Sequence, residues 1–232
     1  MNVVFIVPCY NMSRNFDALV RSLVSQNDVR WRCIMIDDMS DDDTWNVISK
    51  FNNDKFHVIR NKSKKFALRN IVENARAFQE RDDTIIATID GDDSLCNDDT
   101  VSLLIDQYDQ GSDVVWTAHR WDINGMNISK SMPHNVDPYS WPWSTSHLRS
   151  FRSNIIKDIS DDNFKDVNGE WFKRGYDQAL MLPLLSKTEK RAFVDHVCYQ
   201  YNINSVSLKD RSWEEMAQIS TINIVRARGF LK

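Results

Sequence analysis

Short runs of apolar residues alternate with helix-periodic segments along the first half of the chain. Residues 3–7 form an apolar run without a polar position, which is typical of a strand covered on both faces of a sheet. The next segment has apolar residues at the spacing of one buried helix face, namely Phe16, Leu19, Val20, Leu23 and Val24. This alternation predicts a mostly parallel sheet flanked by helices.

The same pattern continues to about residue 117. It predicts further strands over residues 33–36, 56–59, 84–89 and 113–117. It predicts helices over about 45–51, 66–79 and 101–108. We expect Asp42 or Asp43 to begin the first of these helices and Asp98 or Asp99 to begin the last.

The regular alternation of predicted strands and helices ends in the second half of the chain. Residues 121–123 and 126–128 flank Asn124 and Gly125, which predicts a small antiparallel hairpin. Residues 130–146 are irregular and rich in aromatic side chains, and a loop of that length is more often functional than not. A helix near 176–185, a strand near 192–201 and a last helix over about 212–228 complete the prediction.

Composition excludes several classes of protein. The 232 residues carry a net charge of −4, which argues against a nucleic-acid-binding protein that relies on phosphate attraction. No apolar run approaches the roughly 18 residues of a membrane span, and residues 3–7 are too few for a signal-peptide core. The four cysteines form no C-x-x-C pair, which disfavours zinc and redox motifs. We therefore expect a cytoplasmic protein.

Polar and acidic residues follow three of the predicted strands. Residues 8–11, 37–41 and 90–93 stand where each strand ends, and ligands of open parallel sheets bind at the carboxyl ends of the strands. Clustered carboxylates repel one another unless a cation joins them, and oxygen ligands suit Mg²⁺ or Mn²⁺. A solvated turn is the alternative for 37–43 and 90–93. An EF-hand is excluded because Val101 stands where its bidentate glutamate is required.

Four segments together resemble the nucleotide-sugar-dependent glycosyltransferases of family 2. They are residues 3–11, 36–44, 68–70 (Leu-Arg-Asn) and 90–93 (Asp-Gly-Asp-Asp). The resemblance implies a GT-A-type α/β fold, a Rossmann-like α/β/α sandwich with a mostly parallel central sheet and a small antiparallel element in the second half. It also implies a single domain over 1–232, with a nucleotide-binding half over 1–118 and an acceptor and catalytic-base half over 119–232.

The resemblance assigns roles in donor binding. It implies that a nucleoside-diphosphate sugar, with a UDP-sugar as the first expectation, contacts Pro8, Tyr10, Asn11, Asp38, Arg69, Asp90 and Gly91. Asp90 and Asp92 match the Asp-x-Asp motif that holds Mn²⁺ or Mg²⁺, with Asp92 as the principal ligand. Lys62, Lys64 and Lys65 either assist the phosphates or form a solvated basic loop.

The resemblance also implies an acidic general base before a helix of the second half. Asp177 is our candidate, with Glu170 as the second choice, although Tyr176 replaces the first acid of the pair that the family often has. A plain N-cap is the alternative for Asp177. One carboxylate that removes the acceptor proton is sufficient for direct displacement with inversion.

Other assignments concern the acceptor and the metal. Trp141, Trp143 and Trp171, with Glu170, are candidates for a carbohydrate acceptor site, since aromatic rings stack on sugars; the alternative is that they anchor loops. His196 is either an extra metal ligand or a core residue. Asn202 and Asn204 stand where the family pattern predicts an Arg or His.

Two rival functions remain open in the sequence. An aspartate-nucleophile phosphatase or phosphotransferase also begins with Asp-x-Asp after a strand, but that strand normally comes first in the chain. A non-catalytic sugar-nucleotide or carbohydrate-binding module would keep the pocket and lack the base. The last helix either packs on the domain or contacts a partner or a membrane surface, and additional domains in the native protein are compatible with the family.

Overall fold

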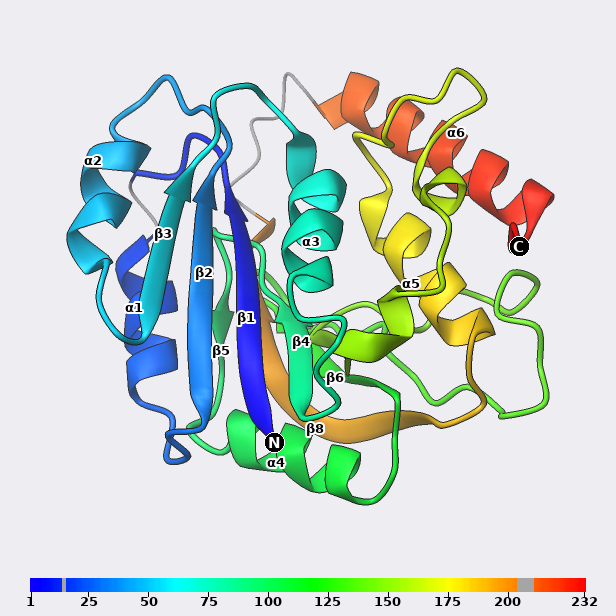
Figure 1. Ribbon diagram of the computed structural model, residues 1–232, viewed down its shortest axis with the longest axis horizontal. Helices are drawn as coiled ribbons and strands as arrows, with labels where there is room; N and C mark the ends of the chain where they lie inside the picture. Colours follow the sequence, from blue (N-terminus) through cyan, green and yellow to red (C-terminus); the bar gives the residue numbers. More distant parts are fainter. Residues whose placement is uncertain (14–15, 204–210) are drawn as a thin grey trace.

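A computed structural model of the chain describes residues 1–13, 16–203 and 211–232. Its described strands form one eight-stranded sheet in the order β3-β2-β1-β4-β7-β6-β8-β5 (Figure 1). The strands are β1 (Asn2–Cys9), β2 (Trp31–Asp37), β3 (Phe56–Arg60), β4 (Thr84–Thr88), β5 (Ser94–Leu95), β6 (Val114–Trp121), β7 (Arg149–Arg152) and β8 (Arg191–Tyr201). The sheet takes strands from both halves of the chain.

Most neighbouring strands in the sheet are parallel. β1 pairs in parallel with β2 and β4, β2 with β3, and β6 with β8. β7 is antiparallel to both β4 and β6, and β5 is antiparallel to β8. The predicted fold class, a mostly parallel α/β sheet with an antiparallel element in the second half, is confirmed.

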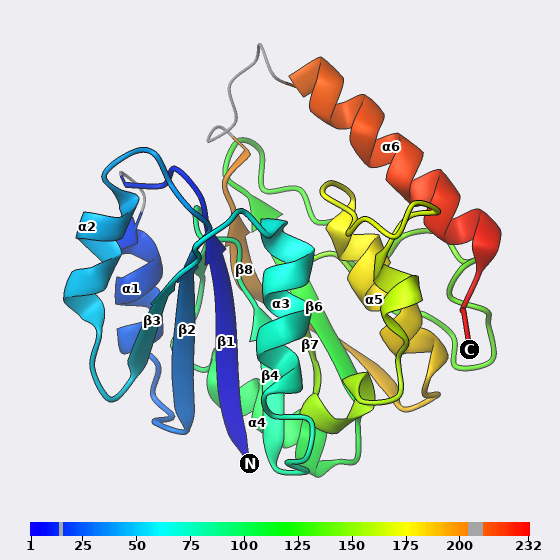
Figure 2. The ribbon, with the colours of Figure 1, turned by 45° about the horizontal axis from the view of Figure 1, so that its top comes forward.

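Helices cover both faces of the sheet. They are α1 (Phe16–Val24), α2 (Thr44–Ile48), α3 (Phe66–Arg76), α4 (Thr100–Asp109), α5 (Tyr176–Ser186) and α6 (Arg211–Arg228). Figures 1 and 2 show α3 in front of the sheet, with α6 packed along α5 at the margin of the molecule. None of the described helices has the length and apolar composition needed to span a bilayer.

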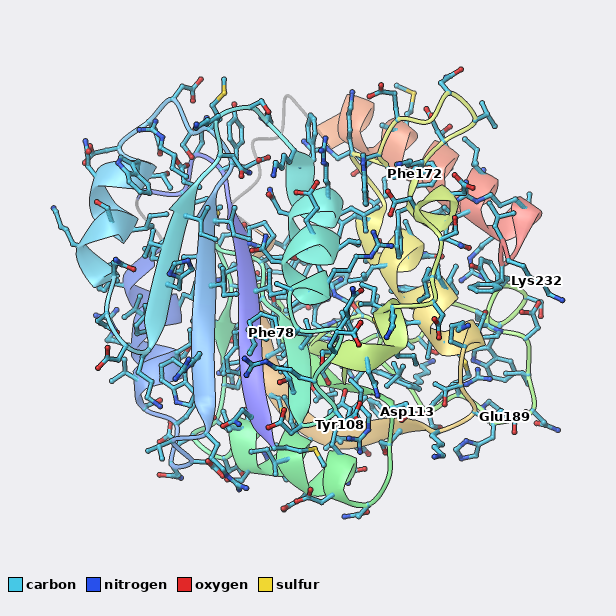
Figure 3. The ribbon with its side chains drawn as sticks, in the orientation of Figure 1. Phe78, Tyr108, Asp113, Phe172, Glu189 and Lys232 are labelled. Carbon is cyan, nitrogen blue, oxygen red and sulfur yellow. The ribbon has the colours of Figure 1, made fainter. Side chains whose placement is uncertain are left out.

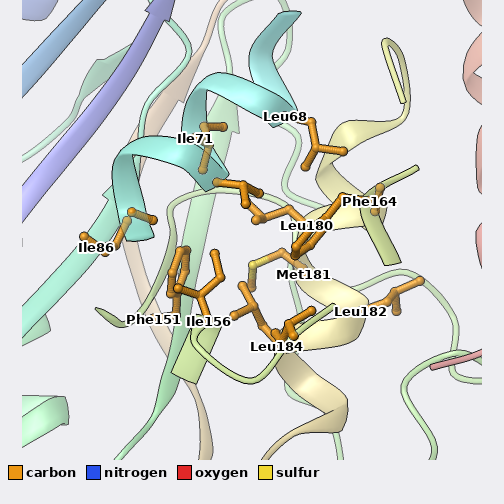
Figure 4. Close-up of a cluster of buried hydrophobic side chains, with 14 of the residues drawn as sticks. Leu68, Ile71, Ile86, Phe151, Ile156, Phe164, Leu180, Met181, Leu182 and Leu184 are labelled. Carbon is orange, nitrogen blue, oxygen red and sulfur yellow. The ribbon is translucent and has the colours of Figure 1, made fainter. Parts of the chain in front are cut away.

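The alternation of side chains along β1 separates two cores. Val4 and Ile6 face the core shared with α3 and α5, whereas Val3, Phe5 and Val7 face the core shared with α1 and α4. Figure 4 shows the first core, in which apolar side chains of α3 meet those of α5 and β7. Each fully buried side chain of this kind stabilises the fold by about 1.5–3 kcal/mol. The apolar run predicted from the sequence therefore contributes to both cores.

The predicted antiparallel hairpin is wrong in its second arm. The turn at Asn124 and Gly125 forms, and the Trp121 N–H donates to the Met126 carbonyl at 3.0 Å. The next position does not continue the ladder, because the His119 N–H donates to the side chain of Asn127 at 3.3 Å. Residues 126–128 are therefore not a strand, and the antiparallel strands are β5 and β7, which the apolar pattern did not predict.

The helix starts differ in detail from the predicted caps. Asp43 and Asp99 occupy the N-cap positions of α2 and α4, but neither side chain makes a capping hydrogen bond. The Asp42 carboxylate instead accepts the Thr44 N–H at 2.9 Å. The helices and strands expected at the other positions are confirmed to within a few residues at their ends.

Candidate active site

A cleft of about 450 Å³ lies at the carboxyl edge of the parallel strands. β1, β2 and β4 run side by side and end at this edge, which is the upper edge of the sheet in Figure 1. The cleft is lined by eight residues that the sequence nominated for the donor or the metal, namely Pro8, Tyr10, Asn11, Asp38, Lys64, Asp90, Gly91 and Asp92. Lys173, Tyr176, Tyr201 and Asn202 are also in the lining. Parallel pairing therefore gathers side chains that are up to 84 residues apart, from Pro8 to Asp92.

Asp38 joins the end of β2 to the beginning of α3. Its carboxylate is 3% exposed and accepts the backbone N–H groups of Lys65 at 2.8 Å and Phe66 at 2.7 Å. The Asn61 side chain donates a third hydrogen bond at 2.7 Å. A helix leaves its first N–H groups without internal partners, so Asp38 satisfies the start of α3 while its side chain borders the cleft.

The loops after β1 and β2 hold each other in place. The Asn11 N–H donates to Ser40 Oγ at 3.1 Å, and Asn11 Oδ1 accepts the Asp41 N–H at 3.1 Å. Tyr10 remains 41% exposed at the cleft, and the Lys64 amine lies 3.0 Å from the centre of its ring. The exposed aromatic face and the adjacent cation give this wall groups suited to a planar, phosphate-bearing ligand.

The acidic turn after β4 is packed against β8. The buried Asp93 carboxylate accepts the Tyr199 hydroxyl at 2.7 Å and the Asn202 N–H at 2.7 Å. Burial, together with the nearby charges of Asp90 and Asp92, raises the pKa of Asp93 to about 9. The ionised forms of these carboxyl groups therefore disfavour one another, and a bound cation would relieve that repulsion.

The described residues offer a donor set that fits a divalent metal ion. One ligand atom each from Asp90, Asp93 and His147 lies within 4.8 Å of the others. His147 is 6% exposed, and its buried Nδ1 has no hydrogen-bond partner among the described residues. Asp92, the expected principal ligand, borders the same cleft but is not a member of this group of three. The carboxylate oxygens suit Mn²⁺ or Mg²⁺, so the expected cofactor is compatible with this turn.

A buried arginine that the sequence did not nominate lies beneath Asp90. Arg149 is 1% exposed, and its Nη2 lies 3.5 Å from Asp90 Oδ2 and 3.3 Å from the Tyr176 hydroxyl. The Tyr176 hydroxyl also donates to Asp90 Oδ1. Burial alone would lower the pKa of the Arg149 guanidinium, but Tyr176, Asp90 and Asp177 outweigh it and the pKa is raised. A single charged position between Leu148 and Phe151 was the only sequence signal.

Asp177 lies in the first turn of α5, next to Tyr176, which lines the cleft, but is itself outside that lining. The N-cap is Gly175 at φ +64°, so Asp177 is not the N-cap. Burial raises the pKa of the Asp177 carboxyl, Arg149 opposes that shift, and Asp90 adds to it. Gly175 is required here, because its positive φ suits glycine and an added Cβ would lie 3.1 Å from the Gln218 carbonyl of α6.

Several nominated residues lie outside the lining of the cleft. Arg69 Nε pairs with Glu73 Oε1 at 2.6 Å. Trp171 stacks on Phe164 with ring centres 6.0 Å apart. Glu170 is exposed and donates its N–H to Asp166 at 3.0 Å, within a turn that Trp171 closes by pairing with Lys165.

The remaining acceptor and metal candidates are also separate from the cleft. Trp141 and Trp143 line a second cavity of about 420 Å³ with Met126 and Ile128. His196 is exposed on β8, 3.6 Å from Asp99 Oδ1. Asn202 does reach the cleft, whereas Asn204 falls outside the described residues.

The three lysines of the basic loop lie in different surroundings. Lys64 lines the cleft, Lys65 pairs with Glu73 at 2.7 Å, and Lys62 is exposed.

Solved structures with the same arrangement of strands and helices are glycosyltransferases of the GT-A type. TarS of S. aureus, in a fragment of residues 1–349 in complex with UDP, has a TM-score of 0.70 and 20% identity, covering 100% of this chain and 67% of that one. Against a longer TarS chain the TM-score is 0.68 at 20% identity, and this chain spans 40% of its length. The mannosyltransferase PcManGT of Pyrobaculum calidifontis, in complex with GDP-Man and Mn²⁺, has a TM-score of 0.64 and 13% identity, covering 98% of this chain and 63% of that one.

Sequence comparison gives a family but no individual relative. No curated protein matches the chain significantly. The model of the family described as "Glycosyl transferase family 2" matches residues 4–164, which is more than half of the chain and includes the ends of β1, β2 and β4. The chain therefore belongs to glycosyl transferase family 2.

Proposed function

We propose that the chain transfers a sugar from a nucleoside-diphosphate sugar, with UDP as the first choice of nucleotide, to a hydroxyl group of a carbohydrate acceptor, with inversion at the anomeric carbon. The observation that carries the proposal is that one cleft contains the acidic turn of Asp90 and Asp92 and is bordered by the start of α5, which carries Asp177. Complexes of TarS with UDP and UDP-GlcNAc, and of PcManGT with GDP-Man and Mn²⁺, support a donor of this class.

The donor end of the cleft is suited to a diphosphate. Asp90, Asp93 and His147, with Asp92 at the same cleft, would hold Mn²⁺ or Mg²⁺, which when bound would supply Lewis-acid stabilisation to the departing diphosphate. Lys64 and Lys173 line the same cleft and add positive charge. Tyr10 and Asp38 border it, where the nucleoside is expected to lie.

Asp177 is proposed as the general base. An acceptor hydroxyl has a very high pKa, so a carboxylate must take its proton as the new carbon–oxygen bond forms. A raised pKa makes the Asp177 carboxylate a stronger base than an exposed aspartate, provided that it is ionised at the working pH. Attack by the activated hydroxyl opposite the leaving diphosphate inverts the anomeric centre, and a second carboxylate is not needed.

Donor binding and turnover test the proposal. We expect a UDP-sugar to raise the melting temperature in the presence of Mn²⁺ and less without it, because a ligand that binds only the folded state stabilises it. GDP- and dTDP-sugars are the comparison donors. NMR of the product from a donor of known anomeric configuration reports inversion or retention. If no nucleotide sugar stabilises the protein in a metal-dependent way, the proposal is wrong.

The Asp177→Asn variant separates transfer from the rival functions. A transferase loses activity and keeps donor affinity, whereas a binding module shows the same affinity and no activity in either form. A phosphatase would hydrolyse a generic phosphate ester, and we expect no such turnover.

A further inference from the structure

Arg149 contacts the cleft through side chains alone. Arg149 lies on β7 and pairs with Thr88 of β4. Because Thr88 comes two residues before Asp90 in the chain, this pairing places the Arg149 side chain beneath the acidic turn. Its polar partners among the described residues include Thr88 Oγ1 at 3.3 Å, the Tyr176 hydroxyl at 3.3 Å and Asp90 Oδ2 at 3.5 Å. The guanidinium also lies 5.3 Å from the centre of the Tyr176 ring.

Two other arginines of the sheet, Arg152 and Arg191, contact backbone carbonyls instead. Arg152, on the same strand, donates to the carbonyls of Ser112 at 2.8 Å and of Tyr108, and pairs with Asp113 at 3.3 Å. Tyr108 and Asp113 lie in the lower part of the molecule in Figure 3, away from the carboxyl edge of the parallel strands where the cleft lies. Such contacts tie the backbones of neighbouring elements together, whereas Arg149 joins side chains that border the cleft.

Arg149 lies where its positive charge offsets the repulsion between two carboxylates near the cleft. Asp90 and Asp177 are both acidic, and their charges disfavour each other. Arg149 is a buried cation that attracts both of them. Tyr176 stands where the family resemblance predicts another acid, and its hydroxyl donates to Asp90 instead of adding a third negative charge.

We propose that Arg149 is a positioning residue that holds Asp90 on the donor side and the Tyr176–Asp177 start of α5 on the base side around one buried guanidinium. Because it is 1% exposed, Arg149 acts through these residues and does not touch the substrate. The inference rests on the proposed glycosyltransferase function and deepens it. It states that the distance and orientation between donor and base depend on this cation.

The experiment compares Arg149→Lys and Arg149→Met with the matched control Arg152→Lys from the same strand. For each protein we would measure kcat for sugar transfer, donor Kd by calorimetry with Mn²⁺, and melting temperature. We expect Arg149→Met to lower kcat by about 10²-fold, the order expected when a reacting group is misplaced by about 1 Å, and Arg149→Lys by about 10-fold because an ammonium lacks the planar fork. Donor Kd should change by less than about fivefold, and Arg152→Lys should keep its kcat.

A double substitution distinguishes positioning from a general structural role. Tyr176→Phe removes the hydroxyl through which Arg149 reaches α5, and Arg149→Met/Tyr176→Phe should match Arg149→Met alone within about threefold, because residues that act as a unit are not additive. Multiplying losses, or a kcat that falls only in step with the melting temperature, would overturn the inference. If Arg149→Met does not fold, Arg149→Lys decides the question by its kcat against its Kd.

The outcome for the unaltered protein separates the two proposals. Absence of donor binding and of transfer by the unaltered protein would overturn the proposed function and this inference with it. An active unaltered protein whose Arg149 variants retain kcat within about twofold would overturn the inference alone.

Discussion

The wall of the cleft formed by the first half of the chain is fixed through hydrogen bonds to backbone N–H groups, whereas the wall formed by the second half is fixed on its α5 side through side chains. Asp38 accepts two backbone N–H groups at the start of α3, and the loops after β1 and β2 exchange hydrogen bonds through Asn11 and Ser40. Across the cleft, Tyr176 and Arg149 meet Asp90 by side-chain atoms.

Because of this difference, substitutions on the two walls are expected to affect different properties of the protein. Backbone contacts on the first wall form whenever the sheet and α3 form, so changes there are expected to alter stability as well as binding. The second wall depends on a few charged and hydroxyl groups whose loss leaves the surrounding helices and strands paired. We therefore expect changes on the second wall to act on turnover more than on stability.

The largest effect is expected from Asp177→Asn on the second wall. Loss of a general base lowers kcat by roughly 10³-fold, within the range for general acid–base catalysis. The melting temperature at neutral pH should stay the same or rise, since burial raises the pKa of this carboxyl and the ionised form therefore costs stability. Steady-state kinetics with thermal unfolding measures both. A variant with unchanged kcat would remove Asp177 from the mechanism.

On the first wall, Asp38→Ala is expected to lower the free energy of unfolding by about 2 kcal/mol, the upper range for loss of a helix cap. The N–H groups of Lys65 and Phe66 lose their acceptor, and Asn61 loses a partner. Urea denaturation measures the change, and donor affinity should fall with it. An equally stable variant would show that the start of α3 is held by other contacts, and the contrast between the walls would fail.

The same contrast explains what the sequence could predict. Pro8, Asp38 and Asp92 follow apolar runs, and the geometry of parallel strands brings such positions together whatever the intervening loops do. Trp141 and Trp143 come from an irregular segment without a pattern that places it, and they line a separate cavity.

Strands with weak patterns were missed for a physical reason. β7 is four residues long with an arginine at each end, and β5 has two residues, so neither shows an apolar run. Both are held by long-range pairing with strands of stronger pattern. Arg149 was missed with β7, because a buried arginine is recognised only once its partners are known.

A buried histidine of the second half, His119, is expected to make the stability of the protein depend on pH. Burial, with a smaller effect from Arg149, lowers the pKa of His119 from 6.5 to about 4. The fold favours the neutral ring, so its contribution to stability is complete above pH 6.5 and is lost as the pH falls toward 4.

His119→Asn isolates this contribution, since an amide can replace the N–H at Nδ1 that faces Ser129 Oγ at 3.1 Å. Between pH 6.5 and 4, the unaltered protein should lose about 1.4 kcal/mol of unfolding free energy per pH unit more than the variant. Denaturation at several pH values measures the two slopes. Equal slopes would mean that His119 is not held neutral by the fold.

The smallest effect is expected from Gly91→Ala on the first wall, where the backbone itself approaches the cleft. A Cβ at this position would lie 2.8 Å from Met12 Sδ and 3.2 Å from the Pro8 carbonyl. The flexible methionine moves at little cost, so stability should change by less than about 1 kcal/mol and donor Kd should weaken by about fivefold. In a Met12→Ala background the same substitution should weaken Kd by less than about twofold, because the nearer clash is gone. A loss that persists in that background would instead assign the effect to the Pro8 carbonyl, 3.2 Å from the added Cβ. It would show that the end of β1 does not shift by the few tenths of an ångström needed to relieve this contact, as expected of a wall that is fixed through its backbone.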